Sequence, residues 1–150
     1  MFKYSFFLLL LIVLSSCSLN STQEQSLNSA KVSYINSKNN GSVMSYVAYT
    51  LPEAVAYYKS KGDSVFQKRF DLSKEQLSEF IQDGNISKVV NDSPIIHVKF
   101  NFISNNITDG ESEVIYAISE NDGSSWFFAE EVDYKNDKII SEIKQLIKGE

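Results

Sequence analysis

Residues 93–104 read Ser-Pro-Ile-Ile-His-Val-Lys-Phe-Asn-Phe-Ile-Ser, in which apolar side chains recur at every second position. Because successive side chains of a strand point to opposite faces of a sheet, this alternation predicts a strand with one buried face. The face expected to be buried carries Ile96, Val98, Phe100 and Phe102. The opposite face, which we expect to be mostly solvated, carries Ile95, His97, Lys99 and Asn101.

Two further stretches alternate in the same way, residues 112–119 and residues 125–130. The connections at 105–110 and 121–124 are rich in Asn, Asp and Gly, which favour tight turns. Three consecutive antiparallel strands are therefore predicted, and a shorter strand over residues 86–90 is expected to precede them.

Upstream of the strands, apolar residues recur every three or four positions, which predicts helices. The stripe consists of Val43, Val47, Leu51, Val55 and Tyr58. Because of Pro52, Leu51 should end one helix and Pro52 should lie in the first turn of the next, with Thr50 as N-cap and Glu53 completing a capping box. Residues 61–63 should stop the second helix. Helices are also predicted over residues 73–82 and 137–148. This order predicts an α+β domain with N-terminal helices packed on one face of a curved antiparallel sheet, and a C-terminal helix.

The amino terminus has the pattern of an export signal. Phe6–Leu14 is an unbroken run of apolar residues that follows Lys3. It is too short for a helix that crosses a bilayer, which needs about 20 apolar residues. The sequence Leu14-Ser15-Ser16-Cys17 resembles the lipobox of bacterial lipoproteins.

That resemblance implies cleavage after Ser16 and a lipid attached to Cys17. It places the chain on a membrane of the cell envelope, and on the outer membrane facing the periplasm if the host is Gram-negative. Residues 1–16 are thus predicted to be the signal peptide, 17–30 the lipidated cysteine with a flexible polar tether, and 31–150 a single domain.

Composition excludes several classes of function. The chain has 14 basic and 19 acidic residues, a net charge of −5 and no basic cluster, so nucleic acid is not expected as a partner. Cys17 is the only cysteine and His97 the only histidine, which excludes disulfides within the chain and a metal site built on several histidines. No Gly-rich phosphate loop occurs. We predict no catalytic residue, no metal site and no cofactor.

Two segments carry a second resemblance. Tyr49-Thr-Leu-Pro-Glu-Ala-Val55 and Tyr116-Ala-Ile-Ser-Glu-Asn-Asp-Gly-Ser-Ser-Trp-Phe-Phe128 resemble small bacterial proteins with a nuclear transport factor two-like fold. The resemblance spans roughly residues 31–133 and implies a cone-shaped α+β domain. Members of that superfamily range from enzymes to inert scaffolds, so it carries no function across.

Four candidate motifs have plainer interpretations. Residues 119–126 are similar to an Asp-box, which we interpret as a hairpin turn with Trp126 packed beneath it. The loop 105–116 lacks the ligands of a calcium site. Glu130, Glu131 and Asp133 are expected to be solvated rim charges. An apolar pocket could be lined by the helical tyrosines, although plain core packing is favoured: Tyr46, Tyr49, Tyr57 and Tyr58.

Three functions remain open. The first is a non-catalytic lipoprotein domain that binds an envelope protein or a small apolar ligand. The second is a small enzyme of the cone-shaped superfamily that uses His97 with a carboxylate. The third is a structural subunit that forms a homodimer through its open sheet face.

Overall fold

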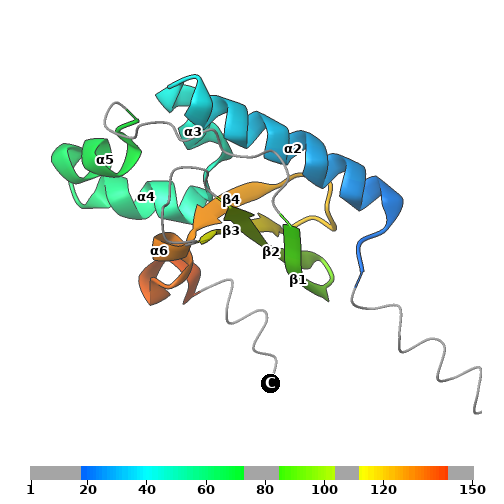
Figure 1. The fold of residues 1–150 in the computed structure, drawn as a ribbon. Coiled ribbons are helices and arrows are strands. Elements are labelled where there is room, and N and C mark those ends of the chain that lie inside the picture. The colour runs from blue at the N-terminus through cyan, green and yellow to red at the C-terminus, as the bar shows by residue number, and fades with distance from the viewer. Residues whose placement is uncertain (1–17, 73–84, 104–111, 142–150) are drawn as a thin grey trace, which may run out of the picture.

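The computed structural model describes residues 18–72, 85–103 and 112–141, which form an α+β domain (Figure 1). Its strands form one antiparallel sheet in the order β1-β2-β3-β4. They are β1 (Asn85–Asp92), β2 (Ile95–Ile103), β3 (Ser112–Ser119) and β4 (Phe127–Glu130). Each strand pairs with the next along the chain, so the predicted meander is confirmed.

Helices precede and follow the sheet. They are α2 (Ser21–Asn39), α3 (Val43–Tyr49), α4 (Pro52–Ser60), α5 (Asp63–Phe70) and α6 (Glu131–Tyr134). Residues 137–141 are helical as well, which confirms the start of the predicted C-terminal helix. The predicted helix over 73–82 and the rest of the C-terminal helix lie outside the described residues.

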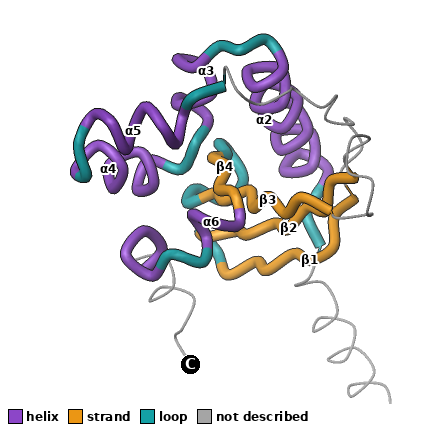
Figure 2. The backbone as a smooth tube through the Cα atoms, turned by 60° about the vertical axis from the view of Figure 1, so that its left-hand side comes forward, coloured by secondary structure: helices purple, strands orange, loops and turns teal. Residues whose placement is uncertain are grey.

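Helices lie on both faces of the sheet (Figure 2). The inner face, which includes Val98, Phe100 and Phe128, packs against Tyr34 and Ile35 of α2 and against α3 and α5. The outer face is covered over β3 and β4 by a second cluster: Leu51, Ala54, Ile95, Ile118, Ala129, Ile139 and Ile140. The expectation of helices on one face and a mostly wet opposite face is therefore wrong, because the apolar side of residues 137–141 needs a surface to cover.

The predicted tether is part of the folded domain. Helix α2 begins at Ser21, and Asn20 caps it through a capping box with Gln23. Leu19 and Leu27 belong to the main core, where Leu27 is only 1% exposed. The first turn is also bound to the β3–β4 turn, since the Gln23 side chain donates to the Asp122 carbonyl oxygen at 3.0 Å. The prediction of a flexible segment over residues 18–30 is wrong for this reason.

The junction between α3 and α4 differs from the predicted one. Helix α4 begins at Pro52, as expected, but its N-cap is Leu51 and no side chain caps it. Thr50 instead follows α3, where its hydroxyl donates to the Tyr46 carbonyl oxygen at 2.8 Å. Thr50 pairs with Phe128, and the Leu51 amide donates to the Phe128 carbonyl oxygen. Extended backbone at the edge of β4 thus replaces the predicted cap. Helix α5 follows directly after Gly62 and was not predicted.

The hairpin between β3 and β4 is closed by side chains, as its Asp-box likeness predicts. The Ser119 hydroxyl accepts from the Gly123 amide at 2.8 Å, and Asn121 Oδ1 accepts from the Ser125 amide at 2.9 Å. Trp126 is buried, and its indole N–H donates to the Gly123 carbonyl oxygen at 3.1 Å. The motif is therefore a structural turn.

Gly123 of this turn tests the contact between the hairpin and α2. It has φ of +82°, and a Cβ added there would lie 2.7 Å from Gln23 Cγ and 3.2 Å from the Trp126 ring. We expect Gly123→Ala to lower the free energy of unfolding by about 2–3 kcal/mol, from backbone strain plus displacement of Gln23. The matched control is Gly41→Ala, which has φ of +65° and open space around the added Cβ. Urea unfolding should show a clearly larger loss for Gly123→Ala, and equal losses would contradict the proposed contact.

Candidate functional site

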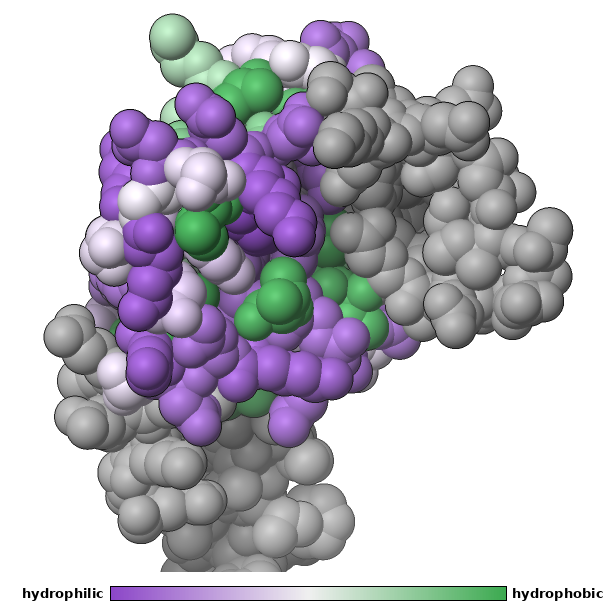
Figure 3. All heavy atoms as spheres, turned by 90° about the vertical axis from the view of Figure 1, so that its left-hand side faces the viewer, coloured by the Kyte–Doolittle hydropathy of each residue, from purple (hydrophilic) through white to green (hydrophobic). Residues whose placement is uncertain are grey.

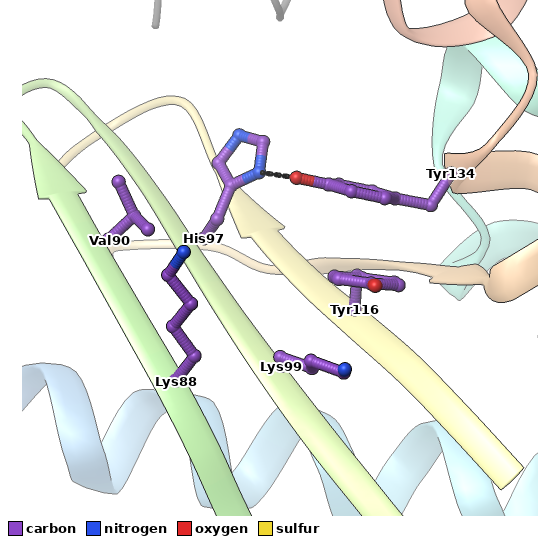
Figure 4. Close-up of a pocket in the computed structure, with 6 residues that line it drawn as sticks. All are labelled: Lys88, Val90, His97, Lys99, Tyr116 and Tyr134. Atoms are coloured by element: carbon purple, nitrogen blue, oxygen red, sulfur yellow. Dashed lines mark hydrogen bonds between the residues drawn. The ribbon is translucent and has the colours of Figure 1, made fainter.

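A hollow on the outer face of the sheet gathers polar and aromatic side chains from three strands and one helix (Figure 4). It measures about 240 Å³ and is lined by Lys88 and Val90 of β1, His97 and Lys99 of β2, Tyr116 of β3 and Tyr134 of α6. Strand alternation places the first five on one face, and Tyr134 reaches them from the helix that follows β4.

His97 lies at the buried end of this group, with only 4% of its surface exposed. Its Nδ1 lies 3.2 Å from the Tyr134 hydroxyl, and among the described residues its Nε2 has no hydrogen-bond partner. Burial lowers the pKa of His97 to about 4, so the ring is neutral at pH 7. The expectation that His97 lies on a solvated surface is wrong, because Tyr134 covers it.

Tyr134 and Tyr116 form the aromatic wall of the hollow. Their rings are stacked, with centroids 3.6 Å apart and an interplanar angle of 6°. The Tyr134 ring also meets His97 edge to face, at 5.8 Å between centroids. Burial raises the pKa of both tyrosines, so both hydroxyls stay protonated at neutral pH and can donate hydrogen bonds.

Lys88 and Lys99 form the cationic side of the hollow. They are direct partners in the β1–β2 register, and both lie on the outer face (Figure 4). Within the described part of the chain neither lysine forms an ion pair, and no carboxylate lines the hollow. Two like charges held directly opposite each other destabilise a sheet. An anionic ligand bound between them would reduce this repulsion.

A second polar cluster lies at the opposite, inner side of β4. The Glu130 carboxylate binds Lys38 Nζ at 2.9 Å, the Tyr46 hydroxyl at 2.6 Å and Arg69 at 3.2 Å. Asp133, which is 0% exposed, binds the Arg69 guanidinium through both oxygens and accepts from the Tyr58 hydroxyl. We call these six residues the ionic network.

The ionic network contains two of the three predicted rim charges. Glu131 is 45% exposed and forms a surface ion pair with Lys135, as a rim charge should. Asp133 is fully buried, and the partly buried Glu130 side chain is only 18% exposed and bound to Lys38 and Arg69, so the prediction is wrong for both. The alternation of β4 turns Glu130 to the same side as Phe128, and α6 carries Asp133 back over the end of the sheet to Arg69.

The charged groups of the ionic network stabilise one another and connect the helices to β4. Burial alone would raise the pKa of Glu130, but Lys38 and Arg69 outweigh it and hold that pKa at about 2. Burial and Asp133 raise the pKa of Tyr58 to about 12. Burial and Glu130 likewise raise the pKa of Tyr46 well above its usual value. Two cations balance two anions, and each carboxylate is bonded to partners from different helices. We therefore assign this network to the stability of the fold.

Of the tyrosines of the early helices, Tyr46 belongs to the core, and the other three are partly buried and pack against it: Tyr49, Tyr57 and Tyr58. Tyr46 is buried between Tyr34 and Phe70, and Tyr34 in turn stacks on Phe128 at 4.5 Å between centroids. This confirms the core-packing interpretation at Tyr46. Tyr58 packs partly against the same core and donates to Asp133.

Some of the predicted sites lie outside the described residues, and the described residues form neither a metal site nor a membrane-spanning helix. Cys17 and the residues of the 105–111 loop lie outside the described residues. In the described part of the chain, no three metal-ligating side chains are grouped to hold an ion. None of the helices described has the length and apolar character needed to cross a bilayer.

Comparisons with protein-family models, curated proteins and solved structures found no match to this chain.

Proposed function

We propose that this chain is a cell-envelope lipoprotein, anchored through lipid on Cys17, whose α+β domain is a non-catalytic binding module. The anchor rests on the sequence pattern of residues 6–17. The binding role is carried by one observation, the hollow in which Lys88 and Lys99 face a buried histidine and two stacked tyrosines. In a Gram-negative host we place the protein on the outer membrane, facing the periplasm.

The surroundings of His97 favour binding over catalysis. The alternative enzyme needs His97 beside a carboxylate that orients it and stabilises its charged form. The side chain bonded to His97 is the hydroxyl of Tyr134, and a pKa of about 4 makes the ring a weak base at pH 7. Both features support a module that holds a ligand without transforming it.

The start of α2 makes the proposed anchor short. Leu19 is buried in the core and Asn20 caps the helix, so a single residue, Ser18, separates Cys17 from packed structure. Since an extended chain spans about 3.5 Å per residue, a lipid on Cys17 would hold the domain within about 10 Å of the bilayer surface. A binding module so placed would act on molecules close to the membrane.

The described fold also supports the proposal of a nuclear transport factor two-like cone. Helices from the N-terminal half cover the inner face of an antiparallel meander, the order that the resemblance implies.

The surface gives less support to a protein partner than to a small ligand. The face over α4, α5 and α6 is mainly hydrophilic, and its hydrophobic side chains form separate spots (Figure 3).

The intact mass of the protein purified from bacterial membranes tests the anchor. We expect the mass of residues 17–150 plus a diacylglycerol, with or without a further acyl chain, and recovery in the membrane fraction. Cys17→Ala should remain uncleaved and unlipidated. Ser18→Ala, which changes the neighbouring residue, should behave as wild type. A wild-type protein without added lipid would refute the proposal.

A further inference from the structure

We propose that the hollow formed by Lys88, Val90, His97, Lys99, Tyr116 and Tyr134 binds a small organic anion, a carboxylate carried on a flat apolar body. This inference rests on the proposed function, because it takes the domain to be a binding module. It narrows that function to one site and to one chemical class of ligand.

The charge of the hollow points to an anion. Lys88 and Lys99 project from adjacent strands on the same face, and no described carboxylate neutralises either of them. Two charged groups lie near Tyr116, Glu131 of α6 and Lys135 directly after that helix, and they pair with each other at 2.7 Å. A carboxylate held between the two ammonium groups would relieve their mutual repulsion and accept hydrogen bonds from both.

The pair His97–Tyr134 has one donor without an acceptor among the described residues, whichever ring nitrogen carries the proton. If the Tyr134 hydroxyl donates to Nδ1, the proton of the neutral ring lies on Nε2, which has no acceptor. If Nδ1 carries the proton and donates, the Tyr134 hydroxyl hydrogen is free. In the second case the Tyr134 hydroxyl can donate to a ligand oxygen, whereas in the first case Nε2 is too deeply buried for a ligand to reach it.

The aromatic wall and the size of the hollow determine the rest of the ligand. Stacked rings of Tyr116 and Tyr134, together with Val90, offer an apolar surface on which a planar group can lie. A hollow of about 240 Å³ is smaller than the pockets of about 300–1,000 Å³ that hold drug-sized molecules. It suits a single ring with one charged substituent.

The test is a titration of the full-length gene product, purified in detergent, followed by ¹H–¹⁵N NMR. The probes are benzoate, its neutral isostere benzamide, and inorganic phosphate. We expect benzoate to shift the amides of Lys88, His97 and Lys99 saturably, with Kd of about 1 mM or tighter. Benzamide, which lacks the charge, and phosphate, which lacks the ring, should each bind at least tenfold more weakly.

Two double variants of equal charge change provide the control. Lys88→Gln with Lys99→Gln should weaken benzoate binding at least tenfold. Lys61→Gln with Lys68→Gln, which removes one exposed lysine directly after α4 and one on α5, should leave it within about twofold. Tyr134→Phe, which removes the hydroxyl and keeps the ring, should weaken binding severalfold. Equal effects of the two double variants, or equal binding of benzoate and benzamide, would overturn the inference.

The same preparation separates this inference from the proposed function. A lipidated protein that binds none of the three probes would overturn the anion site and leave the anchor standing. A protein without lipid that binds benzoate through Lys88 and Lys99 would refute the anchor and support the site. If phosphate bound as strongly as benzoate, the inference that the ligand carries a flat apolar group would be overturned.

Discussion

Asp133→Asn is expected to lower the free energy of unfolding by about 3–5 kcal/mol, the usual cost of removing one partner from a buried ion pair. Asp133 is fully buried and accepts from Arg69, from the Tyr58 hydroxyl and from the Glu130 amide. Asparagine keeps the shape of the side chain but removes the charge. Arg69, itself only 12% exposed, would then have Glu130 as its remaining anion among these residues.

Glu131→Gln is the matched control for this variant. Glu131 lies on the same short helix and also pairs with a cation, Lys135, but both side chains are exposed. Surface pairs of this kind contribute about 0–1 kcal/mol. Urea unfolding, followed through the single buried Trp126, should show a large loss for Asp133→Asn and a small one for Glu131→Gln. Comparable small losses would show that Asp133 does not fasten α6 to α5.

The sheet could be predicted from the sequence because period-two alternation is a strong local signal. Residues 95–103, 112–119 and 127–130 alternate, and each is a strand; Ile96, Val98 and Phe100 lie on the buried face that the alternation predicts. The helix boundaries at Pro52 and near Gly62 followed from residues with restricted or unusual backbone freedom. These features depend on neighbours in the chain, so local patterns reveal them.

Helix α2 was missed because its composition is polar and its apolar residues are sparse. A signal was nevertheless present. Asn20 and Gln23 have the spacing of a capping box, and Leu27, Tyr34 and Ile35 lie seven or eight residues apart on one side of a helix. The polar composition alone favours disorder, whereas the capping box and the spacing of the apolar residues favour a helix. The segment is helical in the structure, because those few apolar residues pack against the inner face of β2.

The ion pairs of Glu130 and the burial of Asp133 and His97 depend on contacts between distant segments, which no local pattern shows. The alternation of β4 does place Glu130 beside Phe128 on the inner face, and that observation could have located it. Its cations come from α2 and α5, 92 and 61 positions away in the sequence, so the pairing itself could not be predicted. His97 is likewise covered by Tyr134 of α6, a short helix that shows no clear hydrophobic periodicity in the sequence.

The stability of the protein is expected to fall steeply in acid because of Glu130. Its pKa is about 2 in the folded protein and 4.5 as the usual value, so the folded state favours the charged carboxylate. A carboxyl group whose pKa is lowered by folding stabilises the protein above its unfolded pKa. This contribution, about 3 kcal/mol at pH 7, is lost as the pH falls from about 5 towards 2.

Urea unfolding between pH 7 and pH 3 measures this dependence, and Glu130→Gln isolates it. Glutamine cannot ionise, so the variant should be several kcal/mol less stable than wild type at pH 7, and the difference should shrink as the pH falls. Glu120→Gln, at an exposed position after β3, should keep the wild-type pH profile. If Glu130→Gln lost stability in acid as steeply as wild type, other carboxylates would control the acid response. The pairing of Glu130 with Lys38 and Arg69 would then contribute little to the folded state.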